Sequence, residues 1–118
     1  MVIAFDIDDT ITRHPKFFSV ISSALVDAGH VVLIITNRHP DDRRATEMEL
    51  QQYGIRFAEL VMCELGASFF SWKAKICKER GVEVFFEDMQ EVIREVGEET
   101  LCLMAVDREI HDLDALCK

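Results

Sequence analysis

The strongest constraint on the fold of this chain is a series of short apolar runs that end abruptly at polar residues. Five such runs are present: Val2–Phe5, Val31–Ile35, a mixed run at Phe57–Met62, Val82–Phe86 and Leu101–Val106. Three of them stop at Asp6, at Thr36 and at the pair Glu87-Asp88. Strands that are apolar throughout are typical of a parallel sheet whose two faces are both covered. We therefore predict a buried parallel sheet.

Amphipathic stretches separate the apolar runs, and proline or glycine marks most of the joins. Helices are predicted from Pro15 to Ala28, between Pro40 and Gly54, from Phe70 to Arg80, from Met89 to Val96, and around Ile110, Leu113 and Cys117. Proline is favoured at the first position of a helix and glycine just beyond its end. The alternation predicts one α/β domain over residues 1–118, a Rossmann-like three-layer α/β/α arrangement around a five-stranded parallel sheet.

Composition narrows the partners that this domain can have. The formal net charge of −9 does not suit general nucleic-acid binding or an anionic membrane surface, because both need a basic face. No segment has the length and apolar character of a membrane span. The four cysteines form no C-x-x-C pair and have no histidine at zinc-ligand spacing, which indicates reduced thiols. We expect a cytoplasmic protein without a membrane segment.

Carboxylates are concentrated at the predicted strand ends. The segment Asp6-Ile7-Asp8-Asp9-Thr10 directly follows the first apolar run, and Glu87-Asp88 follows a later one. Ligands of parallel sheets bind beyond the carboxyl ends of the strands, where both segments are expected. Like-charge repulsion there should raise the pKa of at least one carboxyl group. Mg²⁺ would offset this charge and prefers oxygen ligands, so the pattern favours a magnesium site at Asp6 and Asp8, with Asp88 as the third protein ligand.

These residues resemble the signature of a known family. Asp6-Ile7-Asp8-Asp9-Thr10 is similar to the D-x-D-x-T motif of the haloacid dehalogenase (HAD) superfamily, whose members are mostly phosphatases. The other family motifs follow in order along nearly the whole chain: Thr36, then Lys73 or Lys75, then Glu87-Asp88. Four motifs in order are a stronger signal than any one of them. Position 9 is a departure, since many members have glycine where this chain has Asp9.

The resemblance implies a role for each residue of the first motif. Asp6 is expected to attack phosphorus and form an aspartyl-phosphate. Asp8 is expected to act first as general acid and then as general base, and Thr10 to lie at the phosphate site and hold Asp8 through a hydrogen bond. Mg²⁺ is expected on Asp6, the backbone carbonyl of Asp8 and Asp88. Glu87 is expected behind these ligands, paired to the lysine.

The resemblance also implies which groups receive the phosphoryl oxygens. The expected donors are the backbone N–H groups of Ile7 and Asp8, the hydroxyl of Thr36 and the N–H of Asn37. The lysine that adds positive charge is expected to be Lys73, at the beginning of the predicted helix, with Lys75 as the alternative.

The chain has no room for the cap domain that covers the site in many family members. Only residues 11–14 separate the first motif from the next helix, and only a short loop joins Met62 to Phe70. The resemblance is therefore to the capless type. An open site suits a bulky phosphorylated substrate, or a small one that a second subunit of a homo-oligomer covers.

Two further groups near the predicted site have open interpretations. Arg38 either grips an anionic group of the substrate or forms a surface ion pair with Asp41 or Asp42. The aromatic residues Phe69, Phe70 and Trp72 are expected in the core, and exposure of either phenylalanine would suggest a subunit interface.

Taken together, the motifs predict a Mg²⁺-dependent phosphomonoester hydrolase that works through an aspartyl-phosphate on Asp6, with a phosphorylated substrate whose identity stays open. The alternative is a non-catalytic module that keeps the fold and binds metal or phosphate. The presence of both Asp6 and Asp8 favours the enzyme, because a degenerate member would be expected to lose one of them.

Overall fold

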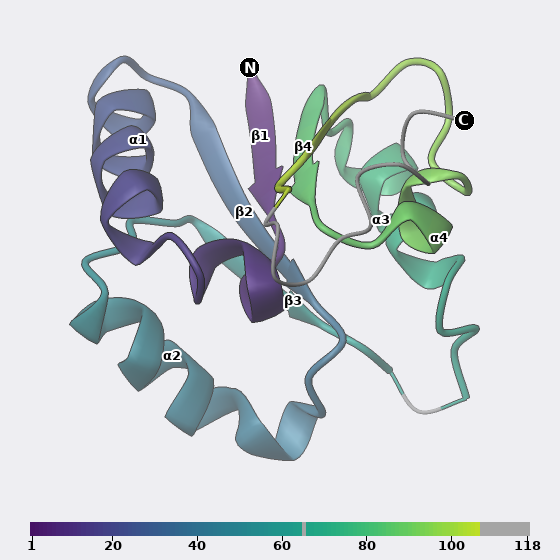
Figure 1. Ribbon diagram of the computed structural model, residues 1–118, viewed down its shortest axis with the longest axis horizontal. Coiled ribbons are helices and arrows are strands. Elements are labelled where there is room, and N and C mark those ends of the chain that lie inside the picture. Colours follow the sequence, from purple (N-terminus) through teal and green to yellow (C-terminus); the bar gives the residue numbers. More distant parts are fainter. Residues whose placement is uncertain (65, 107–118) are drawn as a thin grey trace.

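The computed structural model describes residues 1–64 and 66–106, and its centre is a sheet of five parallel strands (Figure 1). The strands are β1 (Val2–Phe5), β2 (Val31–Thr36), β3 (Glu59–Met62), β4 (Val84–Glu87) and β5 (Leu101–Met104). They lie in the order β3-β2-β1-β4-β5, and every neighbouring pair is parallel. The predicted all-parallel sheet is confirmed.

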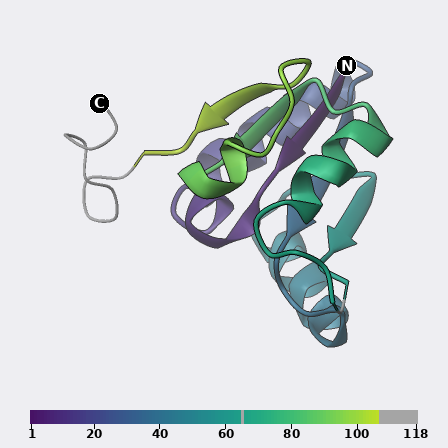
Figure 2. The same ribbon diagram turned by 90° about the vertical axis from the view of Figure 1, so that its right-hand side faces the viewer.

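Helices cover both faces of this sheet (Figure 2). The elements on one face are α1 (Pro15–Asp27) and α2 (Arg43–Gln52), and those on the other are α3 (Trp72–Arg80) and α4 (Gln90–Ile93). Alternate residues of one strand feed two separate cores: Phe5 packs in the cluster that includes Phe18 of α1, and Ala4 packs in the cluster that includes Trp72 of α3. The three-layer α/β/α architecture is therefore as expected.

The sheet order brings the polar strand ends together. β1 lies in the middle, with β2 on one side and β4 on the other. Asp6, Thr36 and Asp88 come at or directly after the carboxyl ends of these three strands, so all three lie at one edge of the sheet. The expectation that they share an edge is borne out.

Several element boundaries differ from the expected ones. The fourth strand begins at Val84 instead of Val82, because the Val82 N–H bonds back to the carbonyl of Cys77 and closes α3. Gly81 makes this closure possible, since its φ of 64° is left-handed. The helix expected from Met89 to Val96 is helical only over Gln90–Ile93. The closing helix expected around Ile110, Leu113 and Cys117 lies outside the described residues.

Some apolar side chains lie at the surface. Phe17 and Val20 on α1 are 53% and 60% exposed, and Leu101 on the edge strand β5 is 58% exposed. Trp72 is buried, but Phe69 and Phe70 are exposed, so the expectation that all three are core residues is wrong for the two phenylalanines. They precede α3 in a loop and pack edge to face against each other.

Connections that could hold a cap are short. A five-residue turn, η1 (Ile7–Ile11), and a few further residues join β1 to α1. The link from β3 to α3 spans residues 63–71. Of the helices in the described part of the chain, none is long and apolar enough to cross a membrane.

Candidate active site

The turn after β1 sets the direction of the first acidic residues. The backbone N–H of Asp6 bonds to the carbonyl of Phe86 at 2.9 Å, which holds the end of β1 against β4. Asp9 then adopts a left-handed conformation with φ 62°, which Asp tolerates better than most residues. The backbone at position 9 therefore needs a residue that accepts positive φ, and aspartate meets that need.

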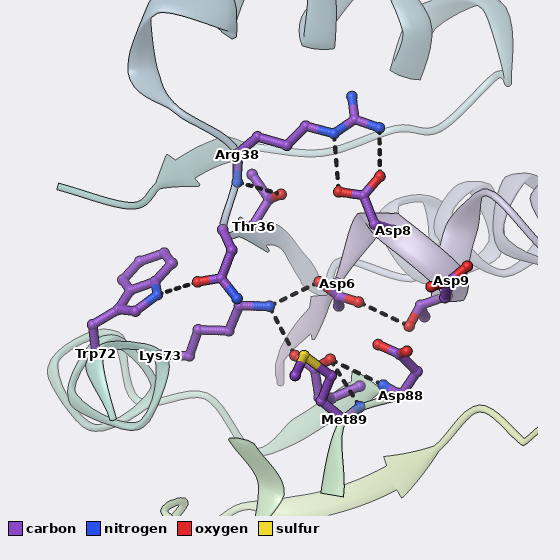
Figure 3. Close-up of polar contacts among 12 residues, drawn as sticks. Asp6, Asp8, Asp9, Thr36, Arg38, Trp72, Lys73, Asp88 and Met89 are labelled. Atoms are coloured by element: carbon purple, nitrogen blue, oxygen red, sulfur yellow. Dashed lines mark hydrogen bonds and ion pairs between the residues drawn. The ribbon is translucent and has the colours of Figure 1, made fainter. Parts of the chain in front are cut away.

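Lys73 lies at the centre of the site. It is 1% exposed, and its Nζ donates to Asp6 Oδ1 and to Glu87 Oε2, both at 2.8 Å (Figure 3). Burial lowers the pKa of Lys73, but the charges of Asp6 and Glu87 outweigh it and the net shift is upward. Lys75 is at the surface and pairs with Glu79, so the structure brings Lys73 and not Lys75 to the site.

Asp6 has a second fixed contact. The hydroxyl of Thr10 donates to Asp6 Oδ2 at 3.0 Å, and both residues are buried. We expected Thr10 to hold Asp8, and this expectation is wrong, because the η1 turn points Thr10 inward while Asp8 stays exposed. Lys73 and Thr10 thus each donate a hydrogen bond to a different oxygen of Asp6.

Glu87 and Asp88 complete the acidic cluster. Glu87 Oε1 accepts the backbone N–H groups of Asp88 at 3.0 Å and of Met89 at 3.2 Å, which fixes the turn after β4. Its other oxygen is on Lys73, as expected for a residue behind the ligands. Asp88 is 8% exposed and does not point to solvent.

Burial makes this cluster costly to ionise. It raises the pKa of Asp6 to about 6, although Lys73 opposes the shift and Glu87 adds to it. Burial, the contact with Glu87 and the charge of Asp6 raise the pKa of Asp88 to about 8. The direction is the one we expected. The cause differs, because burial contributes more than like-charge repulsion in both cases.

The cluster fits a divalent cation. Asp6, Glu87 and Asp88 each offer a carboxylate oxygen, and these oxygens lie within 4.8 Å of one another. Since Glu87 is already engaged by Lys73 and two N–H groups, Asp6 and Asp88 are the better placed carboxylate ligands. Mg²⁺ prefers such oxygens and would supply the positive charge that two buried carboxylates need.

Asp8 occupies a different position from Asp6. Its carboxylate accepts two hydrogen bonds from one edge of the Arg38 guanidinium: Nε donates to Oδ2 at 3.1 Å and Nη2 donates to Oδ1 at 2.9 Å (Figure 3). Arg38 Nη1 contacts Glu49 Oε2 on α2 at 2.6 Å. Neither Asp41 nor Asp42 is its partner, so the surface ion pair considered from the sequence is wrong in its residues. Hydrogen bonding to Asp8 and Glu49 raises the pKa of Arg38.

The second loop lies beside the first. Thr36 is fully buried, and its hydroxyl accepts the backbone N–H of Arg38 at 3.2 Å. The indole N–H of Trp72 donates to the side-chain oxygen of Asn37 (Figure 3). Because an indole N–H can only donate, this contact turns the amide oxygen of Asn37 toward α3.

Sequence reasoning missed several of these contacts, among them those of Glu49 with Arg38 and of Trp72 with Asn37. Glu49 has no motif around it, and its link to Arg38 depends on how α2 packs. The one signal in the sequence was that Glu49 is a polar residue on a helix that follows the loop after β2. Trp72 was expected as a core residue, and its role in orienting Asn37 is additional.

Comparisons with known proteins bear on the fold alone. Neither a known family model nor a curated protein matches the sequence. Two solved structures, titled "Structure of Pnkp1/Rnl/Hen1 complex" and "Structure of the Pnkp1/Rnl/Hen1 RNA repair complex", contain similar chains with TM-scores of 0.71 and 0.72. Sequence identities are 18% and 19%, and the match covers 88% of this chain in both cases. It covers 45% and 42% of those chains, so this chain spans less than half their length.

Proposed function

We propose that this domain is a Mg²⁺-dependent phosphomonoester hydrolase of the HAD type, acting through an aspartyl-phosphate on Asp6. The observation that carries the proposal is the buried group formed by Asp6, Lys73, Glu87 and Asp88 at one edge of the sheet. A lysine held between two carboxylates beside a third is expensive to bury for structural reasons alone. Perturbed ionisable groups of this kind are a general mark of functional sites.

Residues that follow three of the strands, together with Lys73 on α3, would divide the chemistry. Bound Mg²⁺, held by Asp6 and Asp88, would offset the repulsion between the Asp6 carboxylate and an incoming phosphate. Lys73 keeps Asp6 ionised and fixes its orientation, which is the requirement for a carboxylate nucleophile. The N–H groups of the loops after β1 and β2 would receive the phosphoryl oxygens.

The reaction has two balanced steps. In the first, an Asp6 oxygen forms a bond to phosphorus, the bond from phosphorus to the substrate oxygen breaks, and Asp8 gives that oxygen a proton. In the second, Asp8 takes a proton from water, the water oxygen bonds to phosphorus, and the Asp6–phosphorus bond breaks. Inorganic phosphate is released, and Asp6 and Asp8 return to their starting states.

The direct test is capture of the intermediate. A panel of phosphomonoesters with Mg²⁺ should identify a turned-over substrate, and rapid quenching should add one phosphoryl group to the peptide that contains Asp6. Asp6→Asn should abolish turnover and capture, whereas Asp9→Asn, at an exposed neighbour, should retain both. Full activity in pure Asp6→Asn protein would refute the phosphoenzyme mechanism.

The alternative is a non-catalytic module that binds metal or phosphate. The bidentate contact of Asp8 with Arg38 favours it, because both oxygens of the Asp8 carboxylate already accept hydrogen bonds from the guanidinium. Calorimetry separates the two: Mg²⁺ binding that Asp88→Asn removes, without turnover of any substrate by the intact protein, would support the module.

We also propose that the enzyme is cytoplasmic and forms a homo-oligomer. Cys63, Cys77 and Cys102 are free thiols, which fits a reducing, cytoplasmic environment. The exposed pair Phe69 and Phe70 supports a homo-oligomer whose second subunit lies near the open site.

A further inference from the structure

A network of ion pairs leads from Asp8 into α2, and the proposed reaction does not account for most of it. Arg38 presents Nε and Nη2 to the two oxygens of Asp8 (Figure 3). Its Nη1 contacts Glu49 Oε2 at 2.6 Å. Glu49 in turn accepts the hydroxyl of Tyr53 at 3.1 Å through its other oxygen. Arg38 therefore bridges a catalytic-loop residue and a helix.

The two edges of the Arg38 guanidinium have different surroundings. The Asp8 side chain is 60% exposed, whereas that of Glu49 is 32% exposed. The Glu49 edge also contacts the buried hydroxyl of Thr46 at 3.4 Å. A ligand from solvent can therefore replace the carboxylate on the Asp8 edge more readily than the contacts on the other.

The open edge suits an anion with two oxygens. A planar guanidinium binds carboxylate and phosphate through the same pair of parallel N–H groups. Nε and Nη2 already bind Asp8 in this way, at 3.1 and 2.9 Å. An anionic group of a ligand would need no rearrangement of Arg38, only withdrawal of Asp8.

We propose that Arg38 binds a second anionic group of the substrate on the leaving-group side, and that Glu49 is the positioning residue that holds Arg38 for it. The inference rests on the proposed function, in which Asp8 lies beside the leaving oxygen. Because Arg38 touches both Asp8 oxygens, it lies next to the leaving group and not behind the transferred phosphoryl group. Binding exchanges one anion for another on Arg38 and releases the Asp8 carboxylate toward the leaving oxygen. Asp8 then takes up one proton from solvent water, and this is the proton that it donates to the leaving oxygen.

This assignment names a substrate class. The preferred substrates are phosphomonoesters whose alcohol carries another phosphate or a carboxylate near the ester. A substrate without that group leaves Asp8 on Arg38 and is turned over poorly. Hydrogen bonding from Arg38 lowers the pKa of Glu49, so Glu49 stays charged and keeps Arg38 on α2 while the other edge changes partner.

The test compares paired substrates that differ by one phosphate: a nucleoside 3′,5′-bisphosphate with its 3′-monophosphate, and a sugar bisphosphate with its monophosphate. The intact enzyme should prefer the bisphosphate in kcat/KM. Glu49→Ala should reduce this preference about five- to tenfold, mainly through KM, because Arg38 loses its anchor and regains rotamer freedom. Glu49→Gln keeps an acceptor oxygen, so its preference for the bisphosphate should lie between those of the intact enzyme and Glu49→Ala.

Glu47→Ala is the matched control, since Glu47 lies on the same helix and pairs only with Arg43 among the described residues. It should keep the full preference. An unchanged preference in Glu49→Ala would overturn the inference while leaving the phosphatase intact. A larger preference for the bisphosphate in both Glu49 variants would also overturn the inference, because that result would mean that Glu49 acts only through its charge.

A second measurement separates this inference from the proposed function. If the intact protein turns over no phosphomonoester, the function fails, and inorganic phosphate serves as the probe. The Arg38 Nε–H resonance, assigned by its loss in Arg38→Lys, should shift on phosphate titration in the intact protein and in Glu47→Ala. Glu49→Ala should need about tenfold more phosphate. No shift in the intact protein would overturn the inference.

Discussion

Asp88→Asn tests whether the acidic cluster destabilises the folded protein when no metal is bound. Burial raises the pKa of Asp88 from its ordinary 3.8 to about 8. A carboxyl whose pKa is higher in the folded protein binds more protons there than in the unfolded chain between those values. Stability must therefore fall as pH rises from about 4 to about 8, and it is greatest on the acidic side of that window. Asp6, with a pKa of about 6, adds to the fall in its lower half.

The magnitude follows from the same shift. A pKa of about 8 means that Asp88 destabilises the fold by on the order of 5 kcal/mol at pH 8, at about 1.4 kcal/mol per pH unit. Asparagine keeps the shape of the side chain and removes the titration. In EDTA, Asp88→Asn should therefore be more stable than the parent at pH 8 by about 3–5 kcal/mol, and by much less at pH 5.

Urea denaturation at pH 5 and pH 8, with EDTA or Mg²⁺, measures this directly. A Mg²⁺ concentration a hundredfold above its dissociation constant should stabilise the parent by roughly 2.7 kcal/mol. At one fixed Mg²⁺ concentration the stabilisation of the parent should be larger at pH 8 than at pH 5, and that of the variant should be far smaller at both. Asp42→Asn, at an exposed position, should behave as the parent does. Equal stability of the parent at both pH values in EDTA would refute the reasoning. So would an Asp88→Asn variant whose free energy of unfolding falls between pH 5 and pH 8 by as much as that of the parent.

Three further substitutions test other parts of the site. Lys73→Met should destabilise the metal-free protein by about 3–5 kcal/mol in urea, because two buried carboxylates lose their cation, whereas Lys75→Met at the surface should change little. Thr10→Val should cost about 1–3 kcal/mol by the same measurement, since Asp6 Oδ2 loses its donor; no change would mean that water replaces it. Asp9→Gly should be neutral or slightly stabilising in thermal unfolding and Asp9→Val destabilising by about 1–2 kcal/mol, because φ is 62° there; equal effects would argue against strain.

The fold could be predicted because its signals are local. Each apolar run is short enough to be one strand, and proline and glycine mark helix ends by fixing or freeing φ. The errors lie where a contact between elements decides the outcome. Val82 has the composition of a strand residue, but its N–H is used by the end of α3. Phe69 and Phe70 look like core residues, and nothing in a loop of that length reveals whether it packs inward.

The candidate site divides in the same way. Asp6, Thr36 and Asp88 were found because strand ends in a parallel sheet share an edge. Lys73 could be preferred over Lys75 because it begins a helix, and the structure places its Nζ 2.8 Å from Asp6. The contact of Arg38 with Glu49 could not be predicted, because it joins a loop to a helix and no spacing in the sequence records it.

The exposed apolar residues of α1 and β5 have a consequence for handling the protein in solution. Phe17, Val20 and Leu101 offer surface that would gain free energy by self-association, while a net charge of −9 keeps the molecules apart. Dissolved ions shorten the range of that repulsion to about 10 Å at 0.1 M and about 3 Å at 1 M. Concentrated salt should therefore promote aggregation of this protein, and dilute buffer should keep it dispersed.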